Sequence, residues 1–270
     1  MTFTTEELQR LADAAECAAR AGGEIVASHF GRAREVREKS PGDWVSAADE
    51  GSEHAVRETL ERLAPGIAFF GEEFGGDRAD VGWYCDPLDG TANFLHRLEA
   101  VGVSIALVAD GRPVVGVVHV PMLARTYRAT LGGGALRDGE SIRVSDRDPS
   151  RAIAATGFPF RHAHLRPRFL AAFTEALDEF EDLRRVGAAS LDLCWTAEGV
   201  FDGYFELALG TWDVAAGGLI VREAGGVVTD WAGDPDAWLW SGDIVSGPPL
   251  THAALLDLCR RSEEIREKPE

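Results

Sequence analysis

Residues 83–96 read WYCDPLDGTANFLH, an apolar stretch that runs directly into a turn rich in oxygen-bearing side chains. The turn carries Asp86, Asp89 and Thr91. Two carboxylates in a Pro- and Gly-containing turn can aim their oxygens at one point, where a hard cation offsets their repulsion. The competing interpretation is a surface turn with solvated acids, since Asp-Gly turns are common. The segment predicts a metal site at the end of a buried strand.

Length and composition limit the number of domains. The chain has 270 residues, enough for one large α/β domain or two closely packed halves around a substantial core. Hydrophobic residues make up 45% of it, and no linker rich in Pro, Gly or Ser divides it. We predict a single domain over residues 1–270, with an N-terminal half of about 1–148 and a C-terminal half of about 149–270.

Charge argues against two classes of partner. The chain carries 45 acidic and 27 basic residues, a net charge of −18, which repels nucleic acid and anionic membranes. A small phosphorylated metabolite remains compatible with this charge, because bound cations invert the local field.

Four dispersed cysteines indicate neither a disulfide framework nor a thiolate zinc site. With no apolar leader or membrane-length run, we expect a soluble cytoplasmic protein.

The N-terminal half predicts two helices and then a sheet. Helical spacing covers about 5–30, and a second helix starts where Ser46 and Asp49 have the spacing of a capping box, ending at Leu63. Strands over 67–70 and 81–85 run into acids. A hairpin joins 101–108 to 113–120 through Asp110-Gly111, and shorter strands follow to about Val144.

In the C-terminal half, strands and helices alternate. Strands are predicted over 152–156, 184–187, 201–207, 227–229 and 243–246, and helices over 166–180, 190–199, 212–224 and 252–264, with a Trp-rich loop over 231–242. This order predicts an α/β (α+β) layered sandwich of alternating helices and mixed sheets.

Four motifs together resemble one enzyme family. DWVSAAD at 43–49, GEEFG at 71–75, DPLDGTANF at 86–94 and WDVAAG at 212–217 occur in the order found in the inositol monophosphatase superfamily. GGGALRDGESIRVS, TGFPF and YFEL continue the resemblance, which is closest to bacterial inositol-1-monophosphatases. The expected fold is therefore that of inositol monophosphatase and fructose-1,6-bisphosphatase. Trp44 and Ala92 depart from the usual pattern and bear on substrate preference.

The resemblance implies a set of metal ligands. Glu72, Asp86 and the backbone carbonyl of Leu88 would hold one Mg²⁺, and Asp86, Asp89 and Asp213 a second. Glu72 would also hold a weaker third ion through waters, giving two to three ions. Oxygen donors of this kind suit magnesium.

The resemblance also implies catalytic and substrate-binding residues. Thr91, beside Glu72 and Asp49, would orient the attacking water and cap the short helix that opens at Gly90, whose free amides suit a phosphate. Glu206 would accept hydrogen bonds from substrate hydroxyls. The implied substrate-binding set is Asp89, Gly90, Thr91, Gly187, Ala188, Ala189, Glu206 and Asp213.

The expected activity is magnesium-dependent hydrolysis of a phosphomonoester by in-line attack of metal-activated water, with inositol 1-phosphate as substrate. Histidinol-phosphate, sugar-bisphosphate and adenosine-bisphosphate phosphatases of the same superfamily remain alternatives, as does a regulatory interaction protein on the same fold. The resemblance further implies lithium sensitivity and a homodimer. A dehalogenase-type phosphatase, a Walker A loop and a GxSxG elbow do not match these motifs.

Overall fold

The structure is a computed structural model that describes residues 3–32, 36–40, 43–76 and 79–266. Its first part contains α1 (Thr5–His29), β1 (Arg37–Ser40), β2 (Asp43–Val45), α2 (Ala47–Leu63), β3 (Ala68–Gly71), β4 (Val81–Asp89), α3 (Thr91–His96), β5 (Gly102–Ala109), β6 (Arg112–Val120), η1 (Pro121–Leu123), β7 (Arg125–Thr130), β8 (Gly134–Arg137) and β9 (Glu140–Ser141).

The second part contains η2 (Pro149–Arg151), β10 (Ile153–Thr156), η3 (Ala163–Leu165), α4 (Arg166–Glu179), β11 (Asp182–Arg184), α5 (Ala189–Ala197), β12 (Gly203–Leu207), α6 (Thr211–Glu223), β13 (Val227–Thr229), α7 (Trp238–Ser241), β14 (Asp243–Gly247) and α8 (Pro249–Arg266). None of the described helices combines the length and the apolar character that crossing a bilayer requires.

Two mixed sheets organise the molecule. The seven-stranded sheet has the order β3-β4-β5-β6-β7-β8-β9, with β3 and β4 parallel and the other neighbours antiparallel. The five-stranded sheet has the order β11-β10-β12-β14-β13, in which β10 runs parallel to β11 and to β12. The predicted class of alternating helices and mixed sheets is therefore confirmed.

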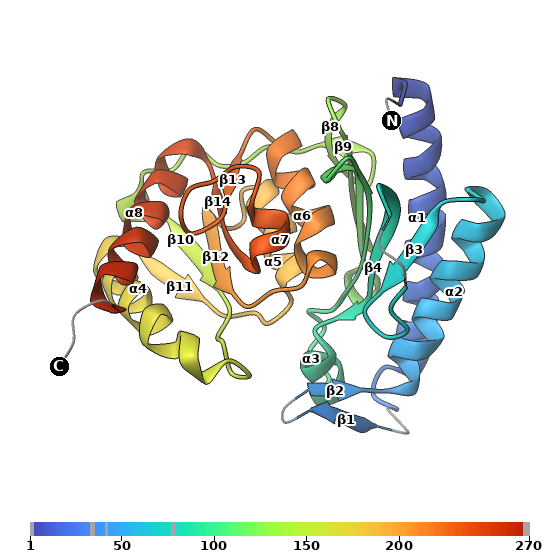
Figure 1. Cartoon of the computed structure of the whole chain (residues 1–270), viewed down its shortest axis with the longest axis horizontal. Coiled ribbons are helices and arrows are strands. Elements are labelled where there is room, and N and C mark those ends of the chain that lie inside the picture. The colour runs from blue at the N-terminus through green and yellow to red at the C-terminus, as the bar shows by residue number, and fades with distance from the viewer. Residues whose placement is uncertain (1–2, 33–35, 41–42, 77–78, 267–270) are drawn as a thin grey trace.

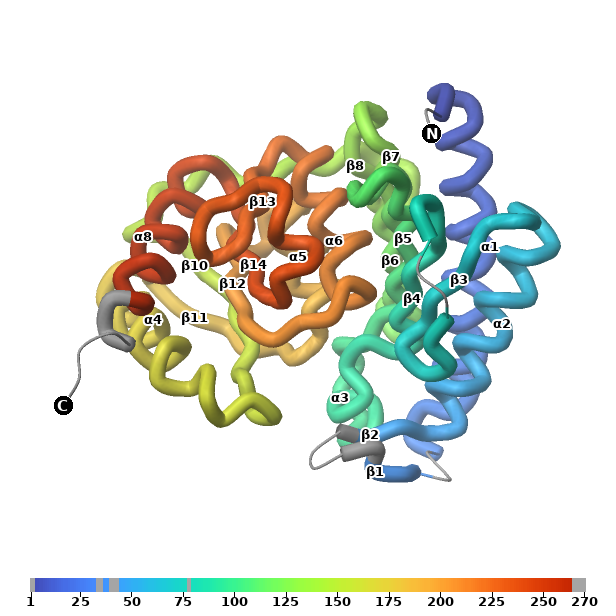
Figure 2. Tube along the Cα trace, in the orientation of Figure 1, coloured from blue at the N-terminus to red at the C-terminus, as the bar shows by residue number. Residues whose placement is uncertain are grey.

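Helices and sheets alternate as layers (Figure 1). α1 and α2 cover the outer face of the seven-stranded sheet, α5 and α6 lie between the two sheets, and α4 and α8 cover the outer face of the five-stranded sheet. Consequently α1 and α8 lie toward opposite ends of the long axis (Figure 2). The prediction of one domain over residues 1–270 stays a prediction.

Three apolar clusters fill the spaces between these layers. Side-chain alternation along β4 directs Trp83 and Cys85 into the cluster under α1 and α2, and Tyr84 into the cluster around α5 and α6. α6 approaches the sheet closely because its residues are small. A Cβ on Gly116 of β6 would lie 2.7 Å from the Ala216 carbonyl oxygen, so only glycine fits there.

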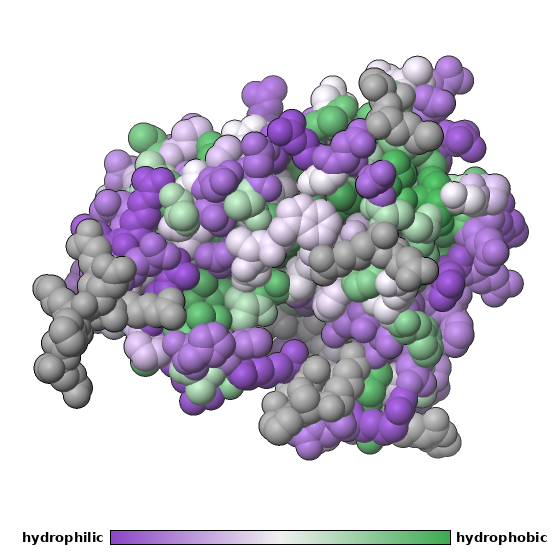
Figure 3. Space-filling model, in the orientation of Figure 1, coloured by the Kyte–Doolittle hydropathy of each residue, from purple (hydrophilic) through white to green (hydrophobic). Residues whose placement is uncertain are grey.

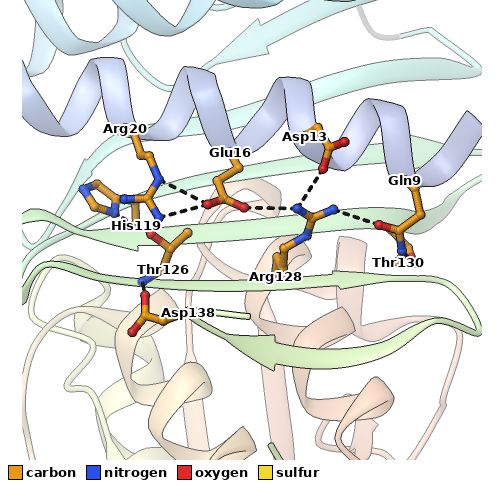
Figure 4. A network of polar contacts seen from close by, with 9 residues as sticks. All are labelled: Gln9, Asp13, Glu16, Arg20, His119, Thr126, Arg128, Thr130 and Asp138. Carbon is orange, nitrogen blue, oxygen red and sulfur yellow. Dashed lines mark hydrogen bonds and ion pairs between the residues drawn. The ribbon is translucent and has the colours of Figure 1, made fainter. Parts of the chain in front are cut away.

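Polar contacts also fasten α1 to the seven-stranded sheet (Figure 4). Arg128 on β7 donates to Asp13 at 2.9 Å, to Glu16 at 3.1 Å and to Gln9 at 2.9 Å. Glu16 also accepts from Arg20 of the same helix at 2.9 Å. One arginine of the sheet thus joins three residues of α1.

Most predicted elements are found, with differences where local signals are weak. The expected strand over 184–187 is wrong: the strand is Asp182–Arg184, which pairs in parallel with β10, and Gly187 then takes a left-handed φ of 91° before α5. The hairpin of β1 and β2 and the short helix α7 were not predicted, since neither shows a clear hydrophobic period.

Candidate metal centre and substrate pocket

Two parallel strands and one helix bring three acids to the same place. Because β3 and β4 are parallel, Glu72 follows β3 at the edge where β4 reaches Asp86, and the Glu72 amide donates to the Cys85 carbonyl at 3.0 Å. Asp213 comes from the first turn of α6. Carboxylate oxygens of Glu72, Asp86 and Asp213 lie within 4.8 Å of one another. The structure thus brings together three of the predicted ligands.

These acids are crowded: Asp86 is buried, and Glu72 and Asp213 are half-buried. Burial raises the pKa of Asp86 well above its usual range, and the charges of Glu72, Asp89 and Asp213 raise it further. Burial likewise raises the pKa of Asp213, with Glu72 and Asp89 adding to the effect. A divalent cation would replace this repulsion by attraction, and an all-oxygen set of donors suits a hard ion. The residues present therefore fit magnesium.

Backbone amides fix the directions of two of the carboxylates. Leu88 donates its amide to Asp86 Oδ1 at 2.9 Å, and Gly210 donates to Asp213 Oδ2 at 2.6 Å. The second contact is expected for an acid in the first turn of a helix. Both acids keep a second oxygen outside these bonds.

Asp89 lies at the end of β4 and is held by the other half of the chain. Its Oδ2 accepts from the amide and the hydroxyl of Ser190, at 2.7 and 2.5 Å, at the N-terminus of α5. Burial raises the pKa of Asp89, while these bonds oppose the rise. Asp89 lines the same pocket as the three acids, but it is not one of the group within 4.8 Å. The sequence analysis placed Ser190 at the start of a helix but did not predict its contact with Asp89.

Thr91 and Asp49 meet as the sequence predicts. The Thr91 hydroxyl lies 3.1 Å from Asp49 Oδ1 and 3.3 Å from the Leu88 carbonyl. Asp49 Oδ2 accepts from the amide and hydroxyl of Ser46, which completes the predicted capping box. Burial raises the pKa of Asp49, and the bonds from Ser46 and Thr91 oppose it.

The expectation that Thr91 caps α3 is wrong. The N-cap is Gly90, with φ 90° and ψ 38°, and no side chain bonds to the helix start. The hydroxyl of Thr91 is directed instead toward Asp49 and Leu88. Capping by a left-handed glycine leaves that hydroxyl within the pocket.

These residues line a cavity of about 250 Å³ between the two sheets. In Figure 3 the surface is hollowed between the two sheets, and hydrophilic side chains border the hollow. The cavity is lined by the predicted residues Glu72, Asp86, Leu88, Asp89, Gly90, Thr91, Gly187, Ala189, Glu206 and Asp213. Ala188 is buried behind this wall, where a Cβ on Gly90 would lie 3.3 Å from the Ala188 Cβ. Asp49 is not among the lining residues, but it accepts a hydrogen bond from Thr91, which is.

Glu206, on β12, forms the wall opposite the seven-stranded sheet. Burial raises its pKa to about 7, although the Tyr204 hydroxyl donates to it and the charge of Arg185 lowers the value. With this pKa the group is about half ionised near neutral pH, and in either form one of its oxygens can accept a hydrogen bond from a hydroxyl.

A basic and aromatic rim borders the pocket and was not predicted. The Arg185 guanidinium lies over the rings of Phe158 and Phe160, at 5.8 and 5.5 Å from their centroids. Arg161 and His162 line the same cavity. Phe158, Phe160, Arg161 and His162 belong to the loop after β10, and Arg185 follows β11. The adjacent arginines Arg184 and Arg185 were the signal in the sequence that could have indicated this basic rim.

Comparisons with known proteins give the family. The model of the inositol monophosphatase family matches residues 7–264. "Nus factor SuhB" of Pasteurella multocida is 40% identical over 238 residues, 86% of this chain and 89% of the relative. "Fructose-1,6-bisphosphatase/inositol-1-monophosphatase" of Aquifex aeolicus is 35% identical over 265 residues, 96% of this chain and 99% of the relative.

Solved structures agree with these relatives. The extragenic suppressor protein suhB of Bartonella henselae superposes with a TM-score of 0.87 at 34% identity, covering 92% of this chain and 98% of that one. An inositol monophosphatase from Anabaena has a TM-score of 0.84 at 32% identity, covering 94% and 96%. With carboxylates converging at the position of the family's acidic motifs, the chain belongs to the inositol monophosphatase family.

Proposed function

We propose that this protein is a magnesium-dependent phosphomonoester hydrolase that converts inositol 1-phosphate to inositol and phosphate. The observation that carries the proposal is the convergence of Glu72, Asp86 and Asp213 within 4.8 Å in a pocket between the two sheets. Family membership supports a metal-dependent phosphatase. The name of the Aquifex relative includes inositol-1-monophosphatase, which supports the choice of substrate.

The metal would be held by Glu72, Asp86 and Asp213, joined by Asp89 and the Leu88 carbonyl, with two to three ions in all. When bound, such ions neutralise the phosphate oxygens, lower the pKa of water and stabilise the leaving alkoxide. The chain's own contribution begins with holding these oxygens in place through the amides of Leu88 and Gly210.

Thr91 and Asp49 would direct the attacking water together with Glu72. Because the Thr91 hydroxyl donates to Asp49, a lone pair of its oxygen is left to accept a proton from water. The proton of Thr91 can then pass to Asp49, whose pKa burial raises and which is thereby a better base than an exposed aspartate. No covalent bond to the protein forms.

Substrate binding would use both halves of the chain. The first amides of α3 lack intrahelical acceptors and can donate to phosphate oxygens. Glu206 would accept from a substrate hydroxyl, and Gly187 and Ala189 would form the second wall, with Ala188 buried behind them. This arrangement suits a phosphorylated polyol.

A second candidate substrate is a sugar bisphosphate. Arg185, Arg161 and His162 line the rim of the pocket, and a basic rim favours a substrate with a second anionic group. The Aquifex relative's name also includes fructose-1,6-bisphosphatase. A purely regulatory role is less well supported, because all the expected acids are present.

The decisive experiment compares phosphate release from inositol 1-phosphate, fructose 1,6-bisphosphate, histidinol phosphate and adenosine 3′,5′-bisphosphate, with and without Mg²⁺. We expect magnesium-dependent release, fastest with inositol 1-phosphate; fastest release from the bisphosphate would select the second candidate. The Asp213→Asn variant is the control and should fold but lose turnover. If no monoester is hydrolysed, the enzyme proposal fails. Lithium inhibition, a homodimer and a cytoplasmic location stay predictions.

A further inference from the structure

A fully buried acid outside the pocket lies beneath the turn that carries Glu72. Glu53, on α2, has an exposed fraction of 0%. Its Oε2 accepts from the Glu73 amide at 2.8 Å, and its Oε1 accepts from the Phe74 amide at 3.1 Å. Burying a carboxylate is costly unless hydrogen bonds replace its water. Here both oxygens receive backbone donors that immediately follow Glu72.

The turn is fixed from its other side as well. Gly71 and Gly75 exchange two backbone hydrogen bonds, of 3.2 and 3.0 Å, and the Glu72 amide donates to the Cys85 carbonyl. These bonds close the turn and tie its start to β4. Glu53 holds the remaining amides, so the backbone on both sides of Glu72 is fixed.

Gly71 shows how closely the carboxylate fits. A Cβ on Gly71 would lie 2.1 Å from Glu53 Oε1, far inside van der Waals contact. Any larger residue would push the carboxylate away from the amides of Glu73 and Phe74. Residue 71, directly before the predicted ligand Glu72, must therefore be a glycine for the Glu53 carboxylate to keep its hydrogen bonds.

We infer that Glu53 is a positioning residue for the metal centre. It orients the 71–75 turn so that the Glu72 carboxylate reaches Asp86 and Asp213, and it does so without lining the pocket. The inference rests on the proposed function, because it assigns a metal-binding role to Glu72. Partners of metal ligands commonly set metal affinity in this way.

The test is the Glu53→Gln variant. Glutamine has nearly the same shape, but its NH₂ group would face one of the two amide donors, so that one bond is lost. We expect Mg²⁺ binding, measured by calorimetry without substrate, to weaken about tenfold. The Mg²⁺ concentration for half-maximal turnover should rise by the same factor, while the KM for substrate at saturating Mg²⁺ changes little.

Two further variants separate positioning from general stability. Gly71→Ala should reproduce the weaker Mg²⁺ binding, because it displaces the same carboxylate. Asp202→Asn is the matched control: Asp202 is 1% exposed, accepts from the Ile153 amide at 2.7 Å, and is not among the residues that line the pocket. It should lower the Tm and leave Mg²⁺ binding unchanged.

The outcomes are distinguishable. If Glu53→Gln and Gly71→Ala lower the Tm as Asp202→Asn does while Mg²⁺ binding stays at the wild-type value, the positioning role is overturned. If the wild-type protein hydrolyses no monoester but Mg²⁺ binding still weakens in both variants, the proposed function fails and the positioning role stands.

Discussion

At the scale of single residues, the central feature is repulsion among acids held close together. Burial raises the pKa of Asp86 first, and the neighbouring Glu72, Asp89 and Asp213 raise it further. Like charges at such separation destabilise the fold unless a cation or a proton compensates them. Metal binding and stability are therefore linked at this site.

Asp86→Asn tests this link. Without Mg²⁺ the variant should be at least as stable as the wild type, because one charge is removed while the amide oxygen can still accept from Leu88. Mg²⁺ should stabilise the wild type by about 2.7 kcal/mol at one hundred times its Kd, and the variant far less. Thermal unfolding with and without Mg²⁺ measures both. Equal stabilisation of the two proteins would remove Asp86 from the metal site.

Thr91 can be tested by two conservative changes. Thr91→Val keeps the shape but removes the hydroxyl that donates to Asp49, and kcat should fall by about 100-fold or more. Thr91→Ser keeps the hydroxyl and should retain most of the activity. Steady-state kinetics at saturating Mg²⁺ measures the difference. Similar kcat values for the two variants would exclude a role for the hydroxyl.

At the scale of elements, α5 connects the two halves of the pocket. Its N-terminus holds Asp89 of β4 through Ser190, while Gly187, before its start, and Ala189, at its start, line the pocket. An element of the C-terminal half thus fixes an acid of the N-terminal half. Binding at either side of the pocket depends on how α5 packs between the sheets.

Arg128 of β7 attaches α1 to the seven-stranded sheet through side chains of α1. Arg128→Met should lower the free energy of unfolding by about 1–2 kcal/mol, because a half-buried guanidinium loses three partners on α1. Arg20→Met is the matched control. Among the described residues, Arg20 forms its hydrogen bonds within α1 and is more exposed, so its replacement should cost less than about 0.5 kcal/mol. Chemical denaturation measures both, and equal losses would contradict the role of Arg128.

At the scale of the whole molecule, the layers bury a histidine whose titration affects global stability. His252 of α8 lies 6% exposed, 2.9 Å from the Thr229 hydroxyl. Burial lowers its pKa from 6.5 to about 4, and the charge of Arg260 adds to the effect. The folded state therefore keeps His252 neutral where the unfolded chain would bind a proton.

The sign of the pH dependence follows. Above pH 6.5 both states are neutral and the full stability is present; between pH 6.5 and 4 the unfolded chain takes up a proton first, so the free energy of unfolding falls. The loss due to His252 is at most about 3 kcal/mol. Denaturant unfolding from pH 7 to 4 should show a shallower decline for His252→Gln than for the wild type. Parallel declines would contradict this assignment.

The sequence by itself determined the features that depend on neighbouring residues. Capping boxes start α1 and α2, and Asp110-Gly111 joins β5 to β6, where both residues take the positive φ of a type I′ turn, 49° and 77°. The acids of the DPLDGT and WDVAAG segments also identified the family. Each of these signals depends on residues that are close together in the sequence, so it can be recognised without knowing how the layers pack.

Only the tertiary structure decided which distant groups meet. The Glu206 wall and the Arg185 rim depend on the loop and strands of the five-stranded sheet. The support of Glu72 by Glu53 depends on how α2 packs beside β4 and meets the turn after β3. The attachment of Asp89 to α5 was equally invisible in the sequence. These contacts arise from burial and close packing between layers, which no local period, cap or turn encodes.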